Sequence, residues 1–568
     1  MRMAVICLRS RRCQATLSLI TAICIPVPDF DARFIAGFLF RFVCATLFIY
    51  PCMVLLFNTT PMEIRFDEWP TRVLLAFSCA LFAAIVTRRP RAASWLPARR
   101  IVVSWVAVFL VVLPFALLKL VMGDNQIGSI LIFLRGDNLG EVVSVGRGSY
   151  GFLLLRAAAL FGAFAALLVF LVRRYAGMEW IVHVLCVVLV ALHPLTGYFI
   201  GLVVPNRLHA EFDPGEYLLR PGELEAPAQA KNLIVVYLES LEATFANLPE
   251  TADGFTPLRR LRERSFSASN VHQVEGTQHT IAGIVASQCG VPLVPYGLND
   301  IGFDHRTRNS LRSFMPSIVC LGDVLSEQGY TVSYMNGASL ERYSKRGFLT
   351  SHGYERLFGL ESIDPATLSG RDNVFGMGDG LLFEHVATEL DVLRRAGKPF
   401  LLSVLTVGTH GPGGFLDRDC PHEDPATTTL ATAIRCTGRA LEHLLDLVDR
   451  SGLGETTLVA VMSDHLVANQ QLIRAPSLGR ALAGARRGRR NLFFINGIER
   501  DVVTKDAAPI DIYPTLLEAL GYRLADHRAN LGVSLLSEEP TLVEVYGERD
   551  VNTLFRHNAR LARVLWRD

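Results

Sequence analysis

Three near-continuous apolar runs in the second half of the chain are its most constraining feature. They cover residues 233–238, 400–407 and 457–462. Runs of this length and composition are typical of strands that are buried on both faces of a parallel sheet. Open α/β sheets bind their ligands beyond the carboxyl ends of the strands. We therefore expect a ligand site where these three runs end.

Each run is followed by side chains that can bind a metal ion. Glu239 follows the first run, His410 lies just after the second, and Asp464-His465 follows the third. A lone carboxylate at a strand end is commonly a surface residue, and an Asp-His pair after a strand is commonly a helix cap. Three such ends at one sheet edge instead indicate a divalent cation with an anionic substrate beside it.

A turn at residues 274–283 carries the candidate nucleophile. Gly276 permits a tight turn, and a helix is predicted over residues 280–287. Thr280 opens that helix, so its hydroxyl would lie beside backbone N–H groups that suit a phosphate. Metal coordination would activate this hydroxyl. Taken alone, Thr280 is a plain helix cap, and Thr277 is the rival nucleophile on the same turn.

The region after residue 231 alternates strands with helices. Besides the three runs, the pattern predicts strands at 331–335 and 491–495, a helix near 431–448, and a helix that opens at Asp511 and ends at Gly521. This alternation indicates an α/β doubly wound domain over residues 232–545. We expect a proline-rich linker before it, at residues 205–231, and a C-terminal tail after it, at residues 546–568.

The apolar residues before position 205 indicate a membrane domain. The candidate spans are residues 34–57, 72–87, 101–122, 152–172 and 180–204. A helix needs ~20 apolar residues to cross the hydrocarbon core, and the second segment is short enough to be re-entrant or tilted. We therefore expect an N-terminal multi-span α-helical membrane domain over residues 1–204, with about five spans.

Short basic loops give the expected orientation. Arginines cluster before the first span, within residues 88–100 and at positions 173 and 174. The positive-inside rule places such loops in the cytoplasm. The chain after residue 205 would then lie outside the cytoplasm, as an exported domain.

Disulfide bonds can form outside the cytoplasm. The exported half holds four cysteines, which are Cys289, Cys320, Cys420 and Cys436. Four cysteines allow three pairings, and sequence alone does not choose among them. We favour Cys420–Cys436 because these two residues are close along the chain.

Several short motifs together carry a family resemblance. They are Tyr237-Leu-Glu239-Ser240-Leu-Glu242, the turn Gly276-Thr277-x-x-Thr280-Ile-Ala-Gly283, Ala286-Ser-Gln-Cys289-Gly, Cys320-Leu-Gly-Asp323, Gly337-Ala-x-Leu340, Ser351-His352-Gly353, Leu405-Thr-Val-x-Thr409-His410, Ser463-Asp464-His465-Leu and Asp511-Ile-Tyr-Pro514-Thr. This set resembles the membrane-anchored phosphoglycerol transferases of the alkaline-phosphatase/sulfatase superfamily. The resemblance covers roughly residues 232–525. It implies an alkaline-phosphatase/sulfatase-like fold for the exported domain.

The resemblance also implies a role for each candidate residue. Four residues match the metal-binding set, with Thr280 also as the nucleophile: Glu239, Thr280, Asp464 and His465. His410 matches a catalytic histidine that contacts the substrate headgroup or protonates the leaving group. Lys345 falls where relatives place a basic substrate-binding residue, and we group it with Thr277 and His410 as the substrate-binding set. Gly408 and Gly411 depart from the family pattern, which has an acidic residue and a second histidine there.

The implied activity is a metal-dependent transfer of phosphoglycerol. The donor would be the anionic phospholipid phosphatidylglycerol, and the acceptor a hydroxyl of a periplasmic glucan, that is, a membrane-derived oligosaccharide. Diacylglycerol would be released. The cofactor would be a divalent metal ion, Mn²⁺ or Mg²⁺, with Zn²⁺ as an alternative. The protein would be a multi-pass protein of the bacterial inner (cytoplasmic) membrane with its catalytic domain in the periplasm.

Other functions remain open at this point. A phosphoethanolamine transferase or a glycerophosphate polymerase would use the same metal and threonine chemistry. A plain sulfatase is disfavoured because no Cys/Ser-x-Pro-x-Arg motif is present on the nucleophile turn. A different class of protein would be a non-catalytic membrane protein that binds glycans or lipids. The net charge of +2 gives no indication of a nucleic-acid partner.

Overall fold

The computed structural model describes the chain from residue 211 onward, with gaps. The described residues are 211–219, 224–294, 314–368, 370–418, 420, 429–468, 472, 475–485, 488–556 and 558–566. The expected membrane domain, residues 1–204, and its five candidate spans lie outside them. Within the described ranges, no helix has both the length and the apolar character that crossing a membrane requires.

An eight-stranded sheet forms the centre of the described structure, in the order β10-β2-β9-β8-β1-β7-β3-β4. The strands are β1 (Asn232–Leu238), β2 (Phe266–Ala268), β3 (Thr331–Asn336), β4 (Arg356–Phe358), β7 (Phe400–Leu405), β8 (Thr457–Ser463), β9 (Phe493–Asn496) and β10 (Val502–Val503). β1 pairs in parallel with both β7 and β8, and β3 pairs in parallel with β7 and β4. The predicted parallel sheet is therefore confirmed. β9 runs antiparallel to β8 and β2.

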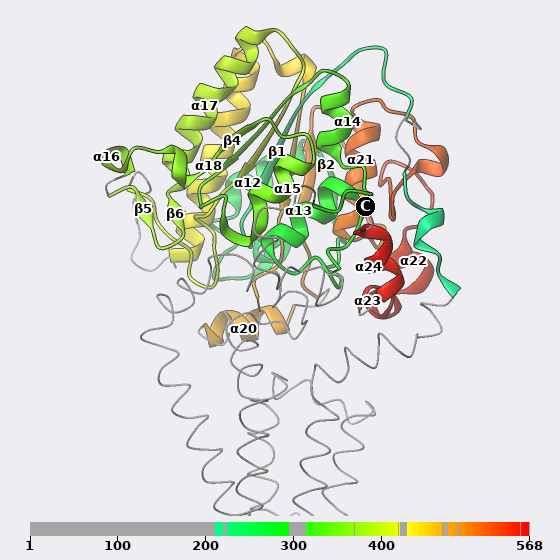
Figure 1. Ribbon diagram of the computed structural model, residues 1–568. Coiled ribbons are helices and arrows are strands. Elements are labelled where there is room, and N and C mark those ends of the chain that lie inside the picture. The colour runs from blue at the N-terminus through cyan, green and yellow to red at the C-terminus, as the bar shows by residue number, and fades with distance from the viewer. Residues whose placement is uncertain are drawn as a thin grey trace, which may run out of the picture. The chain divides into compact units, whose positions relative to one another are not determined.

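Helices cover both faces of this sheet (Figure 1). One face carries α13 (Thr280–Cys289), α14 (Leu321–Glu327) and α21 (Ile512–Ala519), and the other carries α12 (Thr256–Glu263), α17 (Asp379–Ala396) and α18 (Thr429–Arg450). Alternate side chains of β1 enter the two cores: Val235 lies in the first, and Val236 lies in the second. Because both faces of the strand are buried, its sequence is apolar throughout.

The remaining elements are shorter and lie around the sheet. They are α15 (Lys345–Ser351), α16 (Pro365–Leu368), α20 (Pro476–Ala483), α22 (Leu542–Tyr546), α23 (Glu548–Phe555), α24 (Ala559–Leu565), the hairpins β5 (Asp372–Asn373) with β6 (Gly376–Met377) and β11 (Arg528–Ala529) with β12 (Gly532–Val533), and the 3-10 turns η1 (Pro214–Glu216), η2 (Ala243–Asn247), η4 (Arg342–Ser344), η5 (Leu360–Ser362), η6 (Gly454–Thr456), η7 (Pro509–Asp511) and η8 (Ala525–His527).

The last part of the chain, predicted as a tail at residues 546–568, packs against the domain. It contains α23 and α24, which are red in Figure 1. Phe555 and Leu565 are buried side chains of the same core that contains α13 and α21. The segment therefore contributes to the domain's interior.

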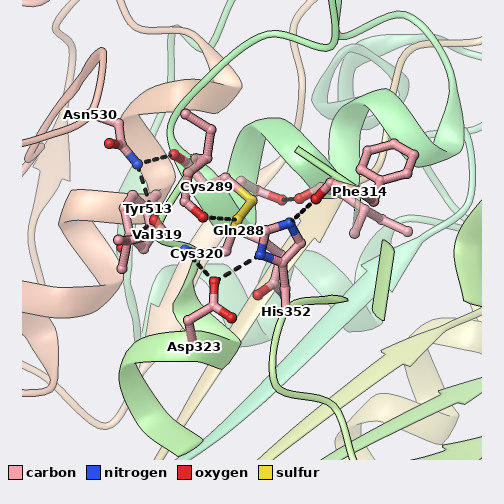
Figure 2. The surroundings of a disulfide bond; sticks show 12 residues. Gln288, Cys289, Phe314, Val319, Cys320, Asp323, His352, Tyr513 and Asn530 are labelled. Atoms are coloured by element: carbon pink, nitrogen blue, oxygen red, sulfur yellow. Dashed lines mark hydrogen bonds and ion pairs between the residues drawn. A yellow bond between two sulfur atoms is a disulfide. The ribbon is translucent and has the colours of Figure 1, made fainter. Parts of the chain in front are cut away.

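Two disulfide bonds join segments that flank the sheet. One is Cys420–Cys436, the pairing favoured from the sequence, which is confirmed. The other, Cys289–Cys320, joins the last residue of α13 to the residue before α14 (Figure 2). Asn530 donates hydrogen bonds to the carbonyls of Cys289 and Val319, at 2.7 and 3.1 Å. The disulfide and the hydrogen bond from Asn530 fix the C-terminal end of α13. The first residue of the same helix is Thr280.

Candidate active site

The strand order brings three ligand-type side chains to one sheet edge. β8, β1 and β7 are neighbours and parallel, so their carboxyl ends lie together. Glu239 directly follows β1, and Asp464 and His465 directly follow β8. The ligand atoms of these three residues lie within 4.8 Å of one another, and all three side chains are buried.

Ser240 fixes the two carboxylates relative to each other. Its backbone is in the left-handed region, with φ of 53°, which is uncommon for a residue with a side chain. In this conformation its hydroxyl donates to Glu239 Oε1 and its backbone N–H donates to Asp464 Oδ1, both at 2.8 Å. The backbone N–H of His465 also donates to Asp464 Oδ1, at 2.8 Å. One oxygen of Asp464 is thereby held by the backbone, and the other is left for a ligand.

The imidazole of His465 is oriented in the way a metal ligand requires. Its Nδ1–H donates to the carbonyl of Leu466 at 2.7 Å, so Nε2 is the nitrogen that faces the cluster and would bind a cation in place of its proton. That Nε2 lies 3.4 Å from both Glu239 Oε1 and Asp464 Oδ2. Asp464 Oδ2 is buried and accepts no hydrogen bond from the described residues. Two carboxylates and one imidazole that converge in this way fit a divalent cation.

The electrostatics of the cluster also favour a bound cation. Burial raises the pKa of Asp464, and repulsion from Glu239 adds to this, to about 7. Burial would raise the pKa of Glu239. The hydrogen bond from His465 and the positive charge of a protonated His410 have the larger effect and hold the pKa of Glu239 below the usual range. Burial opposes protonation of His465, but Asp464 and Glu239 outweigh it and raise its pKa to about 10. Two adjacent buried carboxylates therefore need a positive charge, which the His465 imidazole supplies here and which a divalent cation could supply in its place.

Thr280 is the first residue of α13, as predicted. Its hydroxyl lies 3.4 Å from Glu239 Oε2, to which it donates, and 3.5 Å from His465 Nε2. The backbone N–H groups in the first turn of a helix have no acceptor within the helix and point out of its N-terminal end, where they can bind an anion. The hydroxyl, the metal-type cluster and an anion-binding helix end therefore meet at one place.

Thr277 has a different environment. Its side chain is fully buried, and its hydroxyl donates to the carbonyl of Val274 at 2.7 Å, within the turn. Gly276 has φ of 80°, which a tight turn of this kind requires. The hydroxyl that faces the cluster is therefore that of Thr280, and Thr277 closes the turn.

His410 approaches the cluster from the loop after β7. Its Nδ1–H donates to the carbonyl of Gly411 at 3.0 Å, which leaves the lone pair on Nε2, 4.0 Å from Glu239 Oε1. The ring stacks on Phe375, with ring centroids 3.8 Å apart. Burial lowers the pKa of His410, although Glu239 opposes this. A neutral imidazole with Nε2 toward the site can accept a proton from a substrate.

A buried carboxylate that the sequence analysis missed supports this loop. Asp379, the first residue of α17, accepts hydrogen bonds from the backbone N–H groups of Val407 and Gly408, at 2.8 and 3.0 Å, and from the hydroxyl of Thr437, at 2.7 Å. A Cβ on Gly408 would lie 2.5 Å from Asp379 Oδ2. Gly408 thus leaves room for the carboxylate of Asp379.

Two basic residues lie at the start of α15 and in the turn before it. Lys345, predicted to bind substrate, opens α15 and is only 3% exposed. Arg342, three residues earlier in η4, is a cation whose charge acts on His410. It donates to the carbonyl of Phe375 at 3.1 Å. Sequence reasoning passed over Arg342 because nothing in its local pattern separates it from a surface arginine.

A second cluster of ligand-type residues has a structural explanation. Cys320, Asp323 and His352 also offer ligand atoms within 4.8 Å of one another. The sulfur of Cys320 is in a disulfide, however, and the two ring nitrogens of His352 contact Asp323 Oδ2 at 2.8 Å and the carbonyl of Phe314 at 2.7 Å (Figure 2). These atoms are already engaged, so the cluster ties α14 to the end of α15.

Comparisons with known proteins give the family of this chain. Residues 231–522 match the family described as Sulfatase. Phosphoglycerol transferase I of Xanthomonas campestris pv. campestris is 30% identical over 515 residues, which are 87% of this chain and 69% of that protein. Phosphoglycerol transferase I of Salmonella arizonae is 30% identical over 427 residues, which are 73% of this chain and 52% of that protein. The chain therefore belongs to the sulfatase family, in the group whose curated members are named phosphoglycerol transferase I.

Solved structures show the same similarity at lower identity. The lipoteichoic acid synthase LtaP from Listeria monocytogenes aligns with a TM-score of 0.46 and 16% identity, and the alignment covers 60% of this chain and 92% of that one. A protein in the alkaline phosphatase superfamily from Vibrio parahaemolyticus aligns with a TM-score of 0.42 and 19% identity, covering 60% and 78%.

Proposed function

We propose that this protein transfers phosphoglycerol from phosphatidylglycerol to the hydroxyl groups of a periplasmic glucan, with Thr280 as the nucleophile. One observation carries the proposal. The Thr280 hydroxyl lies at the start of α13 and within 3.5 Å of both Glu239 and His465. The names of the curated relatives support the choice of transferred group.

Four residues would hold the metal ion: Glu239, Thr280, Asp464 and His465. Their oxygen and imidazole donors suit Mn²⁺ or Mg²⁺, with Zn²⁺ as an alternative. When bound, the ion would lower the pKa of the Thr280 hydroxyl and stabilise negative charge on the phosphate oxygens.

In the first step, Thr280 Oγ1 would attack the phosphorus of the lipid. A bond forms between Oγ1 and phosphorus, and the bond from phosphorus to the diacylglycerol oxygen breaks. Thr280 Oγ1 gives up its proton as it attacks, the diacylglycerol oxygen takes up one proton as it leaves, and glycerophosphate remains esterified to Thr280. The N–H groups at the start of α13 would stabilise the phosphate oxygens, and Arg342 would add a positive charge beside His410.

In the second step, a sugar hydroxyl of the glucan would attack the same phosphorus. His410 Nε2 would accept the proton of that hydroxyl, because Nδ1–H is held by the carbonyl of Gly411 and the ring is neutral. The bond from phosphorus to Thr280 breaks, and the threonine hydroxyl is regenerated. The two steps use one site in turn, as in a ping-pong reaction.

The proposed location follows from the donor and from the exported half of the chain. A lipid donor places the reaction at a membrane, and residues 1–204 are the proposed inner-membrane anchor. Two disulfides in the described domain favour an oxidising compartment such as the periplasm.

A covalent intermediate is the direct test. The full chain in detergent is mixed with phosphatidylglycerol vesicles, without glucan, and quenched; peptide mass spectrometry should find glycerophosphate on Thr280. An adduct on Thr277 would reassign the nucleophile, and release of diacylglycerol without any adduct would favour direct transfer. Vesicles of phosphatidylethanolamine are the second arm, since a phosphoethanolamine transferase would modify Thr280 only there. Binding of lipid with no diacylglycerol from either would favour the non-catalytic alternative.

A further inference from the structure

The helix α23 is bonded to the turn that leads to Thr280. Glu548 Oε2 lies 2.7 Å from Nδ1 of His272. Asn552 Oδ1 accepts a hydrogen bond of 2.6 Å from the backbone N–H of Glu275. Arg556, directly after α23, donates to Glu275 Oε2 through Nε and Nη2, at 2.9 and 2.6 Å. These contacts reach the strand-to-helix connection from two positions on α23 and from the residue that follows it.

The three contacting residues form one stripe of the helix. Glu548, Asn552 and Arg556 are four positions apart, and residues at this spacing lie on the same helical face. We call them the polar stripe of α23. The adjacent face carries Val551 and Phe555, which are at most 1% exposed and belong to the core shared with α13. Apolar packing fixes the helix, and the polar stripe is thereby held against the turn.

The contacts continue inside the turn. Glu275 Oε1 accepts a hydrogen bond from Nε2 of Gln278 at 3.1 Å. The other end of that side chain, Gln278 Oε1, accepts from the backbone N–H groups of Gly276 and Thr277 at 2.8 and 3.1 Å. An unbroken series of contacts therefore runs from Arg556 to the backbone N–H of Thr277, three residues before Thr280.

We propose that Asn552 and Arg556 are positioning residues for the nucleophile. They hold Glu275, and through it Gln278, so that the turn presents the Thr280 hydroxyl to Glu239 and His465. Neither residue touches the reacting atoms. Both lie beyond residues 231–522, the part of the chain that matches the sulfatase family, so the C-terminal segment adds this support to the family's domain. The inference rests on the proposed function, since it assigns Thr280 as the nucleophile.

Burial explains why the arginine matters to the turn. The Glu275 side chain is only 7% exposed, whereas that of Arg556 is 54% exposed. A buried carboxylate that loses its cationic partner moves toward water or takes up a proton. Either change weakens its contact with Gln278 and loosens the turn. A misplacement of a reacting group by about 1 Å can cost about 100-fold in rate.

The chain offers a matched control for this proposal. Arg560, on α24, forms an ion pair with Asp213, and its side chain is 47% exposed. It is the same type of residue, in the same C-terminal segment, with a carboxylate partner that lies outside the turn. Arg560→Ala therefore reproduces the loss of a partly exposed ion pair without touching residues 272–278.

The kinetic test uses the full chain in phosphatidylglycerol vesicles. We expect Arg556→Ala and Asn552→Ala each to lower kcat for diacylglycerol release about tenfold or more, a typical cost of losing an outer contact to a site. KM and metal content should be unchanged, and Arg556→Lys should restore part of kcat. Arg560→Ala should keep the kcat of the unmodified chain. The proposal is overturned if Arg556→Ala and Arg560→Ala have equal kcat, or if KM and kcat change together.

Hydrogen exchange tests the same contacts without enzyme activity. The amides of residues 274–279 should exchange faster in Asn552→Ala and Arg556→Ala than in Arg560→Ala, while those of β1 keep their rate. Equal exchange in all variants would overturn the positioning role even if kcat falls. If the unmodified chain releases no diacylglycerol, the proposed function fails, whereas the exchange result still decides whether the polar stripe of α23 holds the turn.

Discussion

At the scale of single residues, the site depends on how each polar atom is occupied. Asp464 shows this most clearly, because one carboxylate oxygen accepts two backbone hydrogen bonds and the other, buried, accepts none from the described residues. Such an arrangement costs free energy unless a ligand completes it. The tautomers of His465 and His410 follow the same logic, since in each the carbonyl contact at Nδ1 leaves Nε2 for the site.

Replacing Asp464 tests the metal-binding role. Asp464→Asn removes a negative charge from the cluster, so we expect bound divalent metal to fall below one tenth of its normal content and diacylglycerol release to be lost. Elemental analysis of the purified protein and a lipid assay measure the two effects. Asp391→Asn, at an exposed carboxylate on α17 that pairs with Arg394, is the control. Full metal content in Asp464→Asn would show that the ligands lie elsewhere.

His410 gives a prediction about pH. Its lowered pKa means that the ring stays neutral to a lower pH than that at which an ordinary histidine gains a proton. If the neutral ring is the base of the second step, the decline of glucan modification on acidification should lie below the pKa of about 6.5 of an ordinary histidine. His410→Gln should slow this step by about 100-fold or more, whereas the Thr280 adduct should still form. Rates from pH 4.5 to 8 measure this, and a decline already near pH 7 would contradict it.

At the scale of elements, sequence and structure agree where burial produces a pattern. β1, β7 and β8 are apolar throughout because helices cover both of their faces, so they and the residues that follow them could be located from the sequence. β2, β4 and β10 contain only two or three residues and are too short to show a period.

The residues that support the site could not be identified from the sequence, for a different reason. Asp379 begins a helix, Ser240 lies just after a strand, Asn552 lies on the short helix α23, and Arg556 directly follows that helix. These are all positions where such residues are ordinary. Their roles come from contacts with residues far away in the chain. No local period encodes such contacts, and they became visible only in the folded domain.

A pair of glycines in the loop after β7 provides a test at this scale. A Cβ on Gly408 would lie 2.5 Å from Asp379 Oδ2, whereas a Cβ on Gly413 would meet nothing within 4 Å. Gly408→Ala should therefore displace the loop that carries His410, destabilise the domain by about 1–3 kcal/mol, and slow glucan modification. Gly413→Ala should change neither. Denaturant unfolding and the transfer assay give the two readouts, and equal behaviour of both variants would refute the packing argument.

At the scale of the whole molecule, the proposed reaction needs both the described domain and the N-terminal 204 residues. A lipid donor and a soluble glucan acceptor meet only at a membrane surface, which explains why a catalytic domain would be joined to an apolar segment of this length. The two disulfides favour a location outside the cytoplasm for the described domain, because the cytoplasm keeps thiols reduced.

The positions of the arginines predict how the chain is oriented in the membrane. The basic loops at residues 88–100 and 173–174 should lie in the cytoplasm, so an odd number of spans before residue 205 puts the catalytic domain in the periplasm. A phosphatase reporter that folds only after export should be active when fused after Val204 and inactive when fused after Arg91. A reporter that functions only in the cytoplasm should show the reverse. Cytoplasmic activity after Val204 would overturn the topology and with it the periplasmic acceptor, because the glucan would then lie on the wrong side of the membrane.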